Sequence, residues 1–184
     1  IIMILALASV SWMTNQRMTQ ATYHYRAVST QLKSTDAIKE DIEQGIGDLL
    51  SYTVGMPEGL NELRGNIVEV RDEIAKADAN FLSTSVVAAR DPAAHKALLE
   101  LSPKLDAIEV TLEQVERTEG DARLELVFDN VIPAVGQLRD IIDGLQDKLG
   151  EKSTAVRGQV DQLISISQMI QIFSSVAATL IAIA

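Results

Sequence analysis

The sequence predicts an all-α protein, an antiparallel up-down-up-down four-helix bundle whose first and last helices continue into transmembrane helices. Three features predict this fold. All 16 basic and 26 acidic residues lie between Arg17 and Asp161, so that two uncharged ends enclose a charged middle. Within that middle, apolar residues recur at helical spacing, and glycine and proline residues divide it into four segments.

The uncharged ends, residues 1–16 and 162–184, are interpreted as parts of transmembrane helices. A helix needs about 20 residues to cross a hydrocarbon core of about 30 Å, so the 23 residues from 162 to 184 are long enough to span. Because their first half is of mixed polarity, the membrane boundary is expected near residues 166–172, and the run is interpreted as the start of a second transmembrane helix. Residues 1–16 are too short to span alone, and Trp12 suits the membrane interface at the end of a first span. The alternatives are a secretory-signal remnant for the first run and a buried core helix for the second.

Between these ends, residues 17–161 are expected to form a single domain with helices at about 17–53, 60–89, 92–118 and 121–161. Apolar residues at alternating steps of three and four form a seam on one face of each helix. The seams of the second and third helices are Leu60, Leu63, Ile67, Val70, Ile74, Ala77, Phe81, Thr84 and Ala88, and Ala94, Leu98, Leu101, Leu105, Ile108, Leu112 and Val115. The first helix shows Val28, Leu32, Thr35, Ile38, Ile42, Ile46 and Leu49, and the fourth begins with Leu124, Val127, Val131 and Val135.

Three turns separate the four helices. Residues 54–59 contain two glycines and a proline, which end the first helix and allow the second to begin. Asp91 is expected to cap the third helix, with Pro92 at its first position, where a missing N–H costs nothing. Gly120 supplies the last turn, and Asp121 is expected to cap the fourth helix.

Two further prolines lie inside predicted helices. The seam keeps its phase across both Pro103 and Pro133, which favours kinks rather than helix ends. A break at Ser102 is the alternative for the first of them. Short loops then predict that both apolar ends lie at one pole of the bundle and that the turns at 54–59 and 119–121 lie at the other.

Composition and motifs exclude several classes of function. The net charge of −10 argues against binding nucleic acid, and equally against docking onto anionic lipid through Lys and Arg. The chain has no cysteine, and its two histidines, His24 and His95, lie on different predicted helices. Neither HExxH, a paired Glu-x-x-His motif nor a phosphate-binding loop is present. We therefore expect no enzyme activity, no metal and no cofactor.

The stretch of residues 130–145, NVIPAVGQLRDIIDGL, together with two spans around a four-helix bundle, resembles the extracytoplasmic sensor region of bacterial methyl-accepting chemotaxis receptors. The resemblance implies a homodimer paired through its first and last helices, in the bacterial inner membrane with the bundle on the periplasmic or extracellular side. It implies that a small-molecule ligand or a periplasmic binding protein meets the membrane-distal half and that the last helix transmits a displacement. The alternatives are the sensor domain of a transmembrane histidine kinase and a membrane-anchored helical scaffold that senses nothing.

The resemblance also shows where this chain departs from known receptors. The aspartate and serine receptors of the family hold the ligand carboxylate with arginines from the first helix. Here the only Lys or Arg residues of that helix are Arg17, Arg26, Lys33 and Lys39, all in its membrane-near or middle portion. An amino-acid ligand at that location is not expected.

Four residues near the predicted distal loops are candidate ligand contacts: Tyr52, Arg64, Arg117 and Arg123. Guanidinium groups bind carboxylates through paired hydrogen bonds, and this surface is otherwise acidic. The alternative is that solvated charge pairs with neighbouring carboxylates account for Arg117 and Arg123, and that Tyr52 fills space at the end of the bundle.

Overall fold

The computed structural model describes residues 2–83 and 91–183, with side chains described for residues 8–82 and 91–179. It confirms the predicted all-α class, because every regular element in these ranges is helical. The elements, in chain order, are α1 (Ile2–Thr53), α2 (Gly59–Ser83), α3 (Pro92–Leu99), α4 (Leu101–Arg117), α5 (Asp121–Leu126), the π-helical turn η2 (Val127–Val131) and α6 (Ile132–Ile183).

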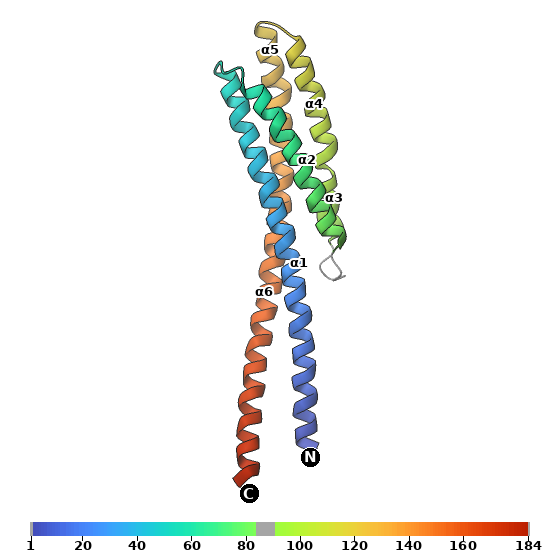
Figure 1. Cartoon of the computed structure of the whole chain (residues 1–184), viewed down its shortest axis with the longest axis vertical. Helices are drawn as coiled ribbons and strands as arrows, with labels where there is room; N and C mark the ends of the chain where they lie inside the picture. The colour runs from blue at the N-terminus through green and yellow to red at the C-terminus, as the bar shows by residue number, and fades with distance from the viewer. Residues whose placement is uncertain (1, 84–90, 184) are drawn as a thin grey trace.

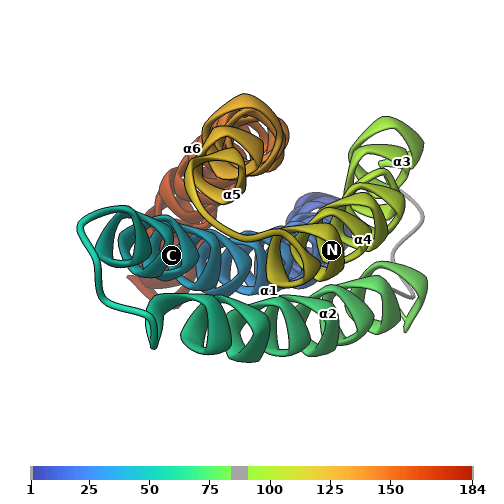
Figure 2. The ribbon, with the colours of Figure 1, turned by 90° about the horizontal axis from the view of Figure 1, so that it is seen from above.

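The two long helices, α1 and α6, lie side by side in opposite directions along the molecule (Figure 1). The helices α2, α3 and α4 accompany them over one half only (Figures 1 and 2). The connections at residues 54–58 and 118–120 lie at the end of this half, which we call the distal pole. Residues 2–35 of α1 and 148–183 of α6 form what we call the shaft, most of which extends beyond α2 and α3.

Both predicted continuations of the helices into the apolar ends are present as unbroken helix, since α1 and α6 each contain 52 residues. Within the described ranges, no helix has an apolar stretch long enough to cross a membrane. The second predicted helix is described as far as Ser83, and the remainder of its prediction, including Thr84 and Ala88, lies outside the described residues.

The predicted seams make the core. Every described seam residue of the second and third predicted helices is at most 5% exposed. On α1, two positions differ from the prediction, because Gln31 and Gly45 are buried where Leu32 and Ile46 were expected. Gly45 fits because a Cβ there would lie only 3.0 Å from the Leu63 side chain of α2. Neither glutamine nor glycine counts as apolar in the seam pattern, so a prediction from apolar spacing misses both positions.

The third predicted helix is broken earlier than its sequence suggested. It was expected to continue through Pro103 with a kink, but α3 ends at Leu99 and α4 begins at Leu101. Proline has no N–H to bond the carbonyl four residues earlier, and for Pro103 that carbonyl belongs to Leu99. Ending α3 there places Pro103 in the first turn of α4, where no such hydrogen bond is needed. The alternative break at Ser102 was closer to the structure than the kink.

The expected kink at Pro133 takes the form of a π-helical turn. In η2 the helical turn contains one residue more than an α-helical turn, and the N–H of Ile132 donates to the carbonyl of Val127, five residues earlier. This wider turn precedes the proline, whose ring would crowd an α-helical carbonyl. The seam also changes phase here, so Val127 is buried while Leu124, predicted to be on the same seam, is 37% exposed.

The predicted caps fare differently. Asp91 caps α3 as expected, because its carboxylate accepts the N–H groups of Ala93 and Ala94. Asp121 is the first residue of α5 rather than its cap, and the cap position is Gly120, at a positive φ of 66°. Only the Asp91 cap therefore adds a side-chain hydrogen bond. Its other carboxylate oxygen lies 3.6 Å from the Lys152 ammonium of α6.

Replacing Asp91 tests this cap. We expect Asp91→Ala to lower the free energy of unfolding by about 1 kcal/mol at pH 7. The hydrogen bond from Ala94, with help from Lys152, lowers the pKa of the Asp91 carboxyl. A lowered pKa gives stability that is present above the ordinary value of 3.8 and is lost as the pH falls through the folded value. The gap between the wild type and the variant in urea unfolding should therefore shrink between pH 7 and about pH 2. Asp121→Ala, which removes no capping bond, should cost less at pH 7.

Gly59 provides a second test, of the contact between α1 and α2. A Cβ at residue 59 would clash with the carbonyl oxygen of Asp48 and lie 2.9 Å from the backbone nitrogen of Tyr52. We expect Gly59→Ala to lower the free energy of unfolding by about 1–3 kcal/mol, because backbone must move. Gly65→Ala on the same helix meets no atom within 4 Å and should raise it by up to about 1 kcal/mol. Equal stability of the two variants in thermal unfolding would contradict the close approach.

Candidate functional site

The distal pole is built by the tight ends of four helical segments. At the end of α1, Gly55 has a φ of 97°, and its N–H bonds the carbonyl of Tyr52. At the other connection, Gly120 has a φ of 66° and starts α5. Because both connections are short, the end of α1, the start of α2, the end of α4 and the start of α5 lie at one end of the molecule (Figure 1).

Two of the four candidate residues are brought together there. The guanidinium carbon of Arg123 lies 5.5 Å from the centre of the Tyr52 ring, in the geometry of a cation–π contact. Tyr52 is 8% exposed, so its ring belongs to the core and also contacts the guanidinium group of Arg123. Arg123 has no hydrogen-bond or ion-pair partner within the described part of the chain, and its Nε is buried.

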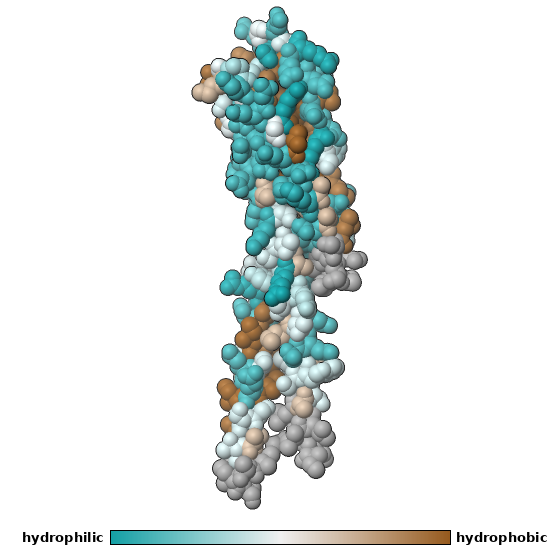
Figure 3. Space-filling model, in the orientation of Figure 1, coloured by the Kyte–Doolittle hydropathy of each residue, from teal (hydrophilic) through white to brown (hydrophobic). Residues whose placement is uncertain are grey.

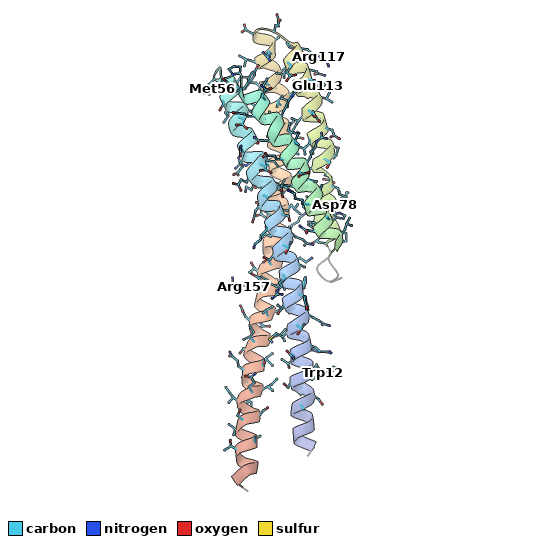
Figure 4. All side chains as sticks on the ribbon, in the orientation of Figure 1. Trp12, Met56, Asp78, Glu113, Arg117 and Arg157 are labelled. Atoms are coloured by element: carbon cyan, nitrogen blue, oxygen red, sulfur yellow. The ribbon has the colours of Figure 1, made fainter. Side chains whose placement is uncertain are left out.

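The other two candidates are paired with carboxylates. Arg64 of α2 lies 2.9 Å from Glu116 of α4, which joins these two helices near the pole. Arg117 lies 3.4 Å from Glu113, one turn earlier on the same helix, and Figure 4 shows both residues near the end of α4. Solvated charge pairing therefore describes Arg64 and Arg117. It does not describe Arg123.

The electrostatic setting makes Arg123 an exception. The segments that form the pole carry the carboxylates Glu58, Glu62, Glu113, Glu116, Glu119, Asp121 and Glu125. Arg123 lies among them over an aromatic ring, and no carboxylate of the described residues pairs with it. A planar guanidinium held in this way has hydrogen-bond donors available for an incoming carboxylate or another small anion.

Two exposed apolar residues on the segment that carries Arg123 were not predicted as part of the site. Leu124 is 37% exposed and Phe128 is 53% exposed, on the same helical segment. The seam pattern assigned Leu124 to the core, and no residue pattern indicated that its side chain is exposed. These side chains leave apolar surface exposed on the segment that carries Arg123.

The hollows that the structure describes elsewhere are less suited to a ligand. A cavity of about 20 Å³ lies between α1, α2, α4 and α6, and its polar lining comes from Asp41 and Asn66. This volume is about that of one water molecule. Burial, together with the carboxylates of Glu69 and Glu73, raises the pKa of Asp41. A larger hollow is lined by Phe81, Leu82, Asp91, Pro92 and His95, and its polar side chains are already used in the Asp91 cap and in the contact of His95 with Asp78.

No group of three His, Cys, Asp or Glu side chains in the described ranges is arranged to hold a metal ion. His95 already has structural contacts, since its ring stacks on Phe81 at 5.6 Å and its Nε2 lies 2.5 Å from Asp78. These contacts tie α3 to α2.

Comparison with known proteins gives no significant match to a family model, a curated protein or a solved structure.

The contact between Tyr52 and Arg123 can be measured by a double-mutant cycle of Tyr52→Leu and Arg123→Gln. We expect a coupling energy of about 0.5–2 kcal/mol in the free energy of unfolding, because the cation is partly desolvated over the ring. The control cycle is Glu113→Gln with Arg117→Gln, whose side chains are 53% and 79% exposed. That cycle should give no more than about 0.5 kcal/mol. Equal coupling in the two cycles would contradict the special position of Arg123.

Proposed function

We propose that this chain is the extracytoplasmic sensor region of a transmembrane chemotaxis receptor, in which binding at the distal pole changes the position of α6. In this proposal the chain is not an enzyme, and its helices form an antiparallel up-down-up-down four-helix bundle. The ligand is a small anion held by Arg123, with Tyr52 beneath the guanidinium and Leu124 and Phe128 beside it. A periplasmic binding protein that presents a carboxylate at this surface would use the same cation.

The observation that carries the proposal is the direct path from Arg123 to the shaft. The elements α5, η2 and α6 follow one another without a loop. The last of them, Ile132–Ile183, is a helix of 52 residues and therefore about 78 Å long. A force on the first turn of α5 thus reaches the far end of the shaft through continuous hydrogen-bonded backbone.

A membrane setting is the second part of the proposal, with both shaft ends in a bacterial inner membrane and the bundle on its periplasmic or extracellular side. It is supported by the lack of any charged side chain in residues 1–16 and 162–184. Figure 3 shows apolar surface on the lower part of the shaft and mainly polar surface beside the distal pole. The exposed apolar residues of this part of α6 are Ile164, Ile166, Met169, Ile172, Phe173 and Val176.

A homodimer paired through the first and last helices is the third part. On the solvent face at the end of α1 lie Gly47 and Leu50, and the exposed Val54 follows as the first residue after the helix. Leu50 is 54% exposed and Val54 is 76% exposed. No atom lies within 4 Å of the Cβ position at Gly47, so a second helix has room to approach there. This apolar face supports pairing near the distal pole.

Ligand-induced stabilisation tests the sensing site. We expect at least one small carboxylate or phosphate to raise the unfolding temperature of the full chain in mild detergent. At a free concentration of 100 times Kd, the gain is about 2.7 kcal/mol. Arg123→Gln should abolish the shift. Arg117→Gln, which removes the same charge six residues away, should keep it. A panel in which no anion stabilises the wild-type chain, or in which both variants respond alike, would contradict binding at Arg123.

A further inference from the structure

The charge of the chain is divided unequally between its two halves. Residues 1–35 contain three cations and no carboxylate. Residues 148–184 contain three more cations and only two carboxylates, Glu151 and Asp161. The shaft therefore has a formal charge of +4 in a chain whose net charge is −10. Net charge thus argues against binding to anionic lipid by the rest of the chain, but not by the shaft. Because α1 and α6 lie side by side, the fold gathers these six cations in one region (Figure 1).

The shaft cations also differ from the others in their partners. Nine Lys and Arg residues between 36 and 147 have described side chains, and seven of these have a carboxylate within 4.0 Å. In the shaft, Lys152 is paired with Asp91. The remaining five shaft cations are exposed and have no ion pair within the described part of the chain. They are Arg17, Arg26, Lys33, Lys148 and Arg157.

The register of the two long helices shows which of these cations lie at the same position along the axis of the α1–α6 pair. Lys39 is paired with Asp143 at 2.6 Å, and Gln146 donates to Asp36 at 2.7 Å. Continued along the antiparallel pair, this register places Arg26 level with Arg157. Figure 4 shows Arg157 on the part of α6 that extends beyond α2. The two uncharged runs also come level, so that Arg17 marks the beginning of the charged surface on α1 and Asp161 marks it on α6.

The distance of each cation from the uncharged end of its helix, measured along the helix axis, separates the five cations into two groups. At 1.5 Å per residue, Arg26 lies about 14 Å beyond Arg17, and Arg157 lies about 8 Å beyond residue 162. Extended arginine side chains reach back over several of these ångströms. Lys33 lies more than about 20 Å from Arg17, and Lys148 lies more than about 20 Å from residue 162. Both distances exceed two Debye lengths at physiological salt.

We propose that Arg17, Arg26 and Arg157 form a collar that binds the headgroups of anionic lipids in the leaflet from which the shaft emerges. The proposal rests on the membrane setting given above. Anionic headgroups supply the oxygen acceptors that these guanidinium groups lack among the described residues. Anionic lipid around the collar would hold α1 and α6 at a defined height, so the lipid composition of the membrane sets the resting position from which α6 moves.

Other anionic partners fit the charge distribution less well. A nucleic acid is a long polyanion, and it would be repelled by the remaining residues of the chain, which carry the large excess of carboxylates. The acidic distal pole of a second copy is also anionic. It has no reason to lie beside the apolar shaft ends, whereas lipid headgroups lie there in any membrane that the shaft enters.

The single tryptophan of the chain makes the collar measurable. Trp12 is 63% exposed and lies five residues before Arg17 (Figure 4). The full chain is placed in nanodiscs of phosphatidylcholine with a minor fraction of phosphatidylglycerol. Bromine is attached to the acyl chains of one lipid or of the other, in separate samples with the same mole fraction of brominated lipid. We expect brominated phosphatidylglycerol to quench Trp12 at least about twofold more than brominated phosphatidylcholine, because the headgroups gather at the collar.

The variants test whether the collar is the cause. In Arg17→Gln/Arg26→Gln/Arg157→Gln the quenching ratio should fall to about 1, and high salt should lower the wild-type ratio in the same direction. The matched control Lys33→Gln/Lys148→Gln/Lys96→Gln removes the same charge away from the collar and should keep the wild-type ratio. Circular dichroism of each variant confirms that it remains helical, and the salt series on the wild-type chain provides the test if the triple variant does not fold.

The outcomes separate this inference from the proposed function. Equal quenching of wild-type Trp12 by both brominated lipids would overturn the collar and leave the membrane setting in place. Absence of quenching by either lipid would overturn the membrane setting itself. A twofold preference that survives in the folded collar variant would overturn the assignment to these three arginines.

Discussion

The antiparallel pairing of α1 with α6 is the contact on which the rest of the structure depends. Its core is the pair of buried seams, and its register is marked on the surface by Lys39 with Asp143 and by Asp36 with Gln146. Apolar seams hold two helices together, but a register needs specific pairs, because a seam of similar side chains tolerates sliding by a heptad. The register brings the ends of α1 and α5 to one pole and brings the shaft cations level with one another.

Much of the helical framework was predictable from the sequence because it rests on local rules. The spacing of apolar residues identified buried residues of α2, α3 and α4, since every described seam residue there is buried, and on α2 it passed over the buried Asn66. The Asp91 cap followed from residue chemistry in the same way. The prolines were recognised as disruptions, but the form of each disruption depended on which carbonyl lost its partner. A seam pattern does not contain that information.

Prediction was least successful where neighbouring helices decide the outcome. Gln31 is 1% exposed, and neither atom of its amide has a hydrogen-bond partner within the described part of the chain. The seam pattern assumes that buried positions are apolar, because an unsatisfied buried polar group costs free energy, and Gln31 is an exception to this assumption. Arg117 and Arg123 looked alike in sequence, since both stand among carboxylates. Only the fold shows that one has a glutamate on its own helix and that the other lies over a tyrosine from α1.

The π-helical turn at Val127–Val131 has a consequence for the geometry of the pole. A π turn holds about one residue more than an α turn, so it rotates everything before it by about 100° relative to everything after it. Residue 123 therefore occupies the angular position that residue 124 would have in an uninterrupted helix. That offset turns a leucine outward and an arginine toward Tyr52. The orientation of the face that carries Arg123 is thus set by one inserted residue, which precedes a proline. A single deletion in this turn would rotate α5 by about 100°, so that Leu124 would take the place of Arg123 over Tyr52 and every other residue of α5 would shift with it.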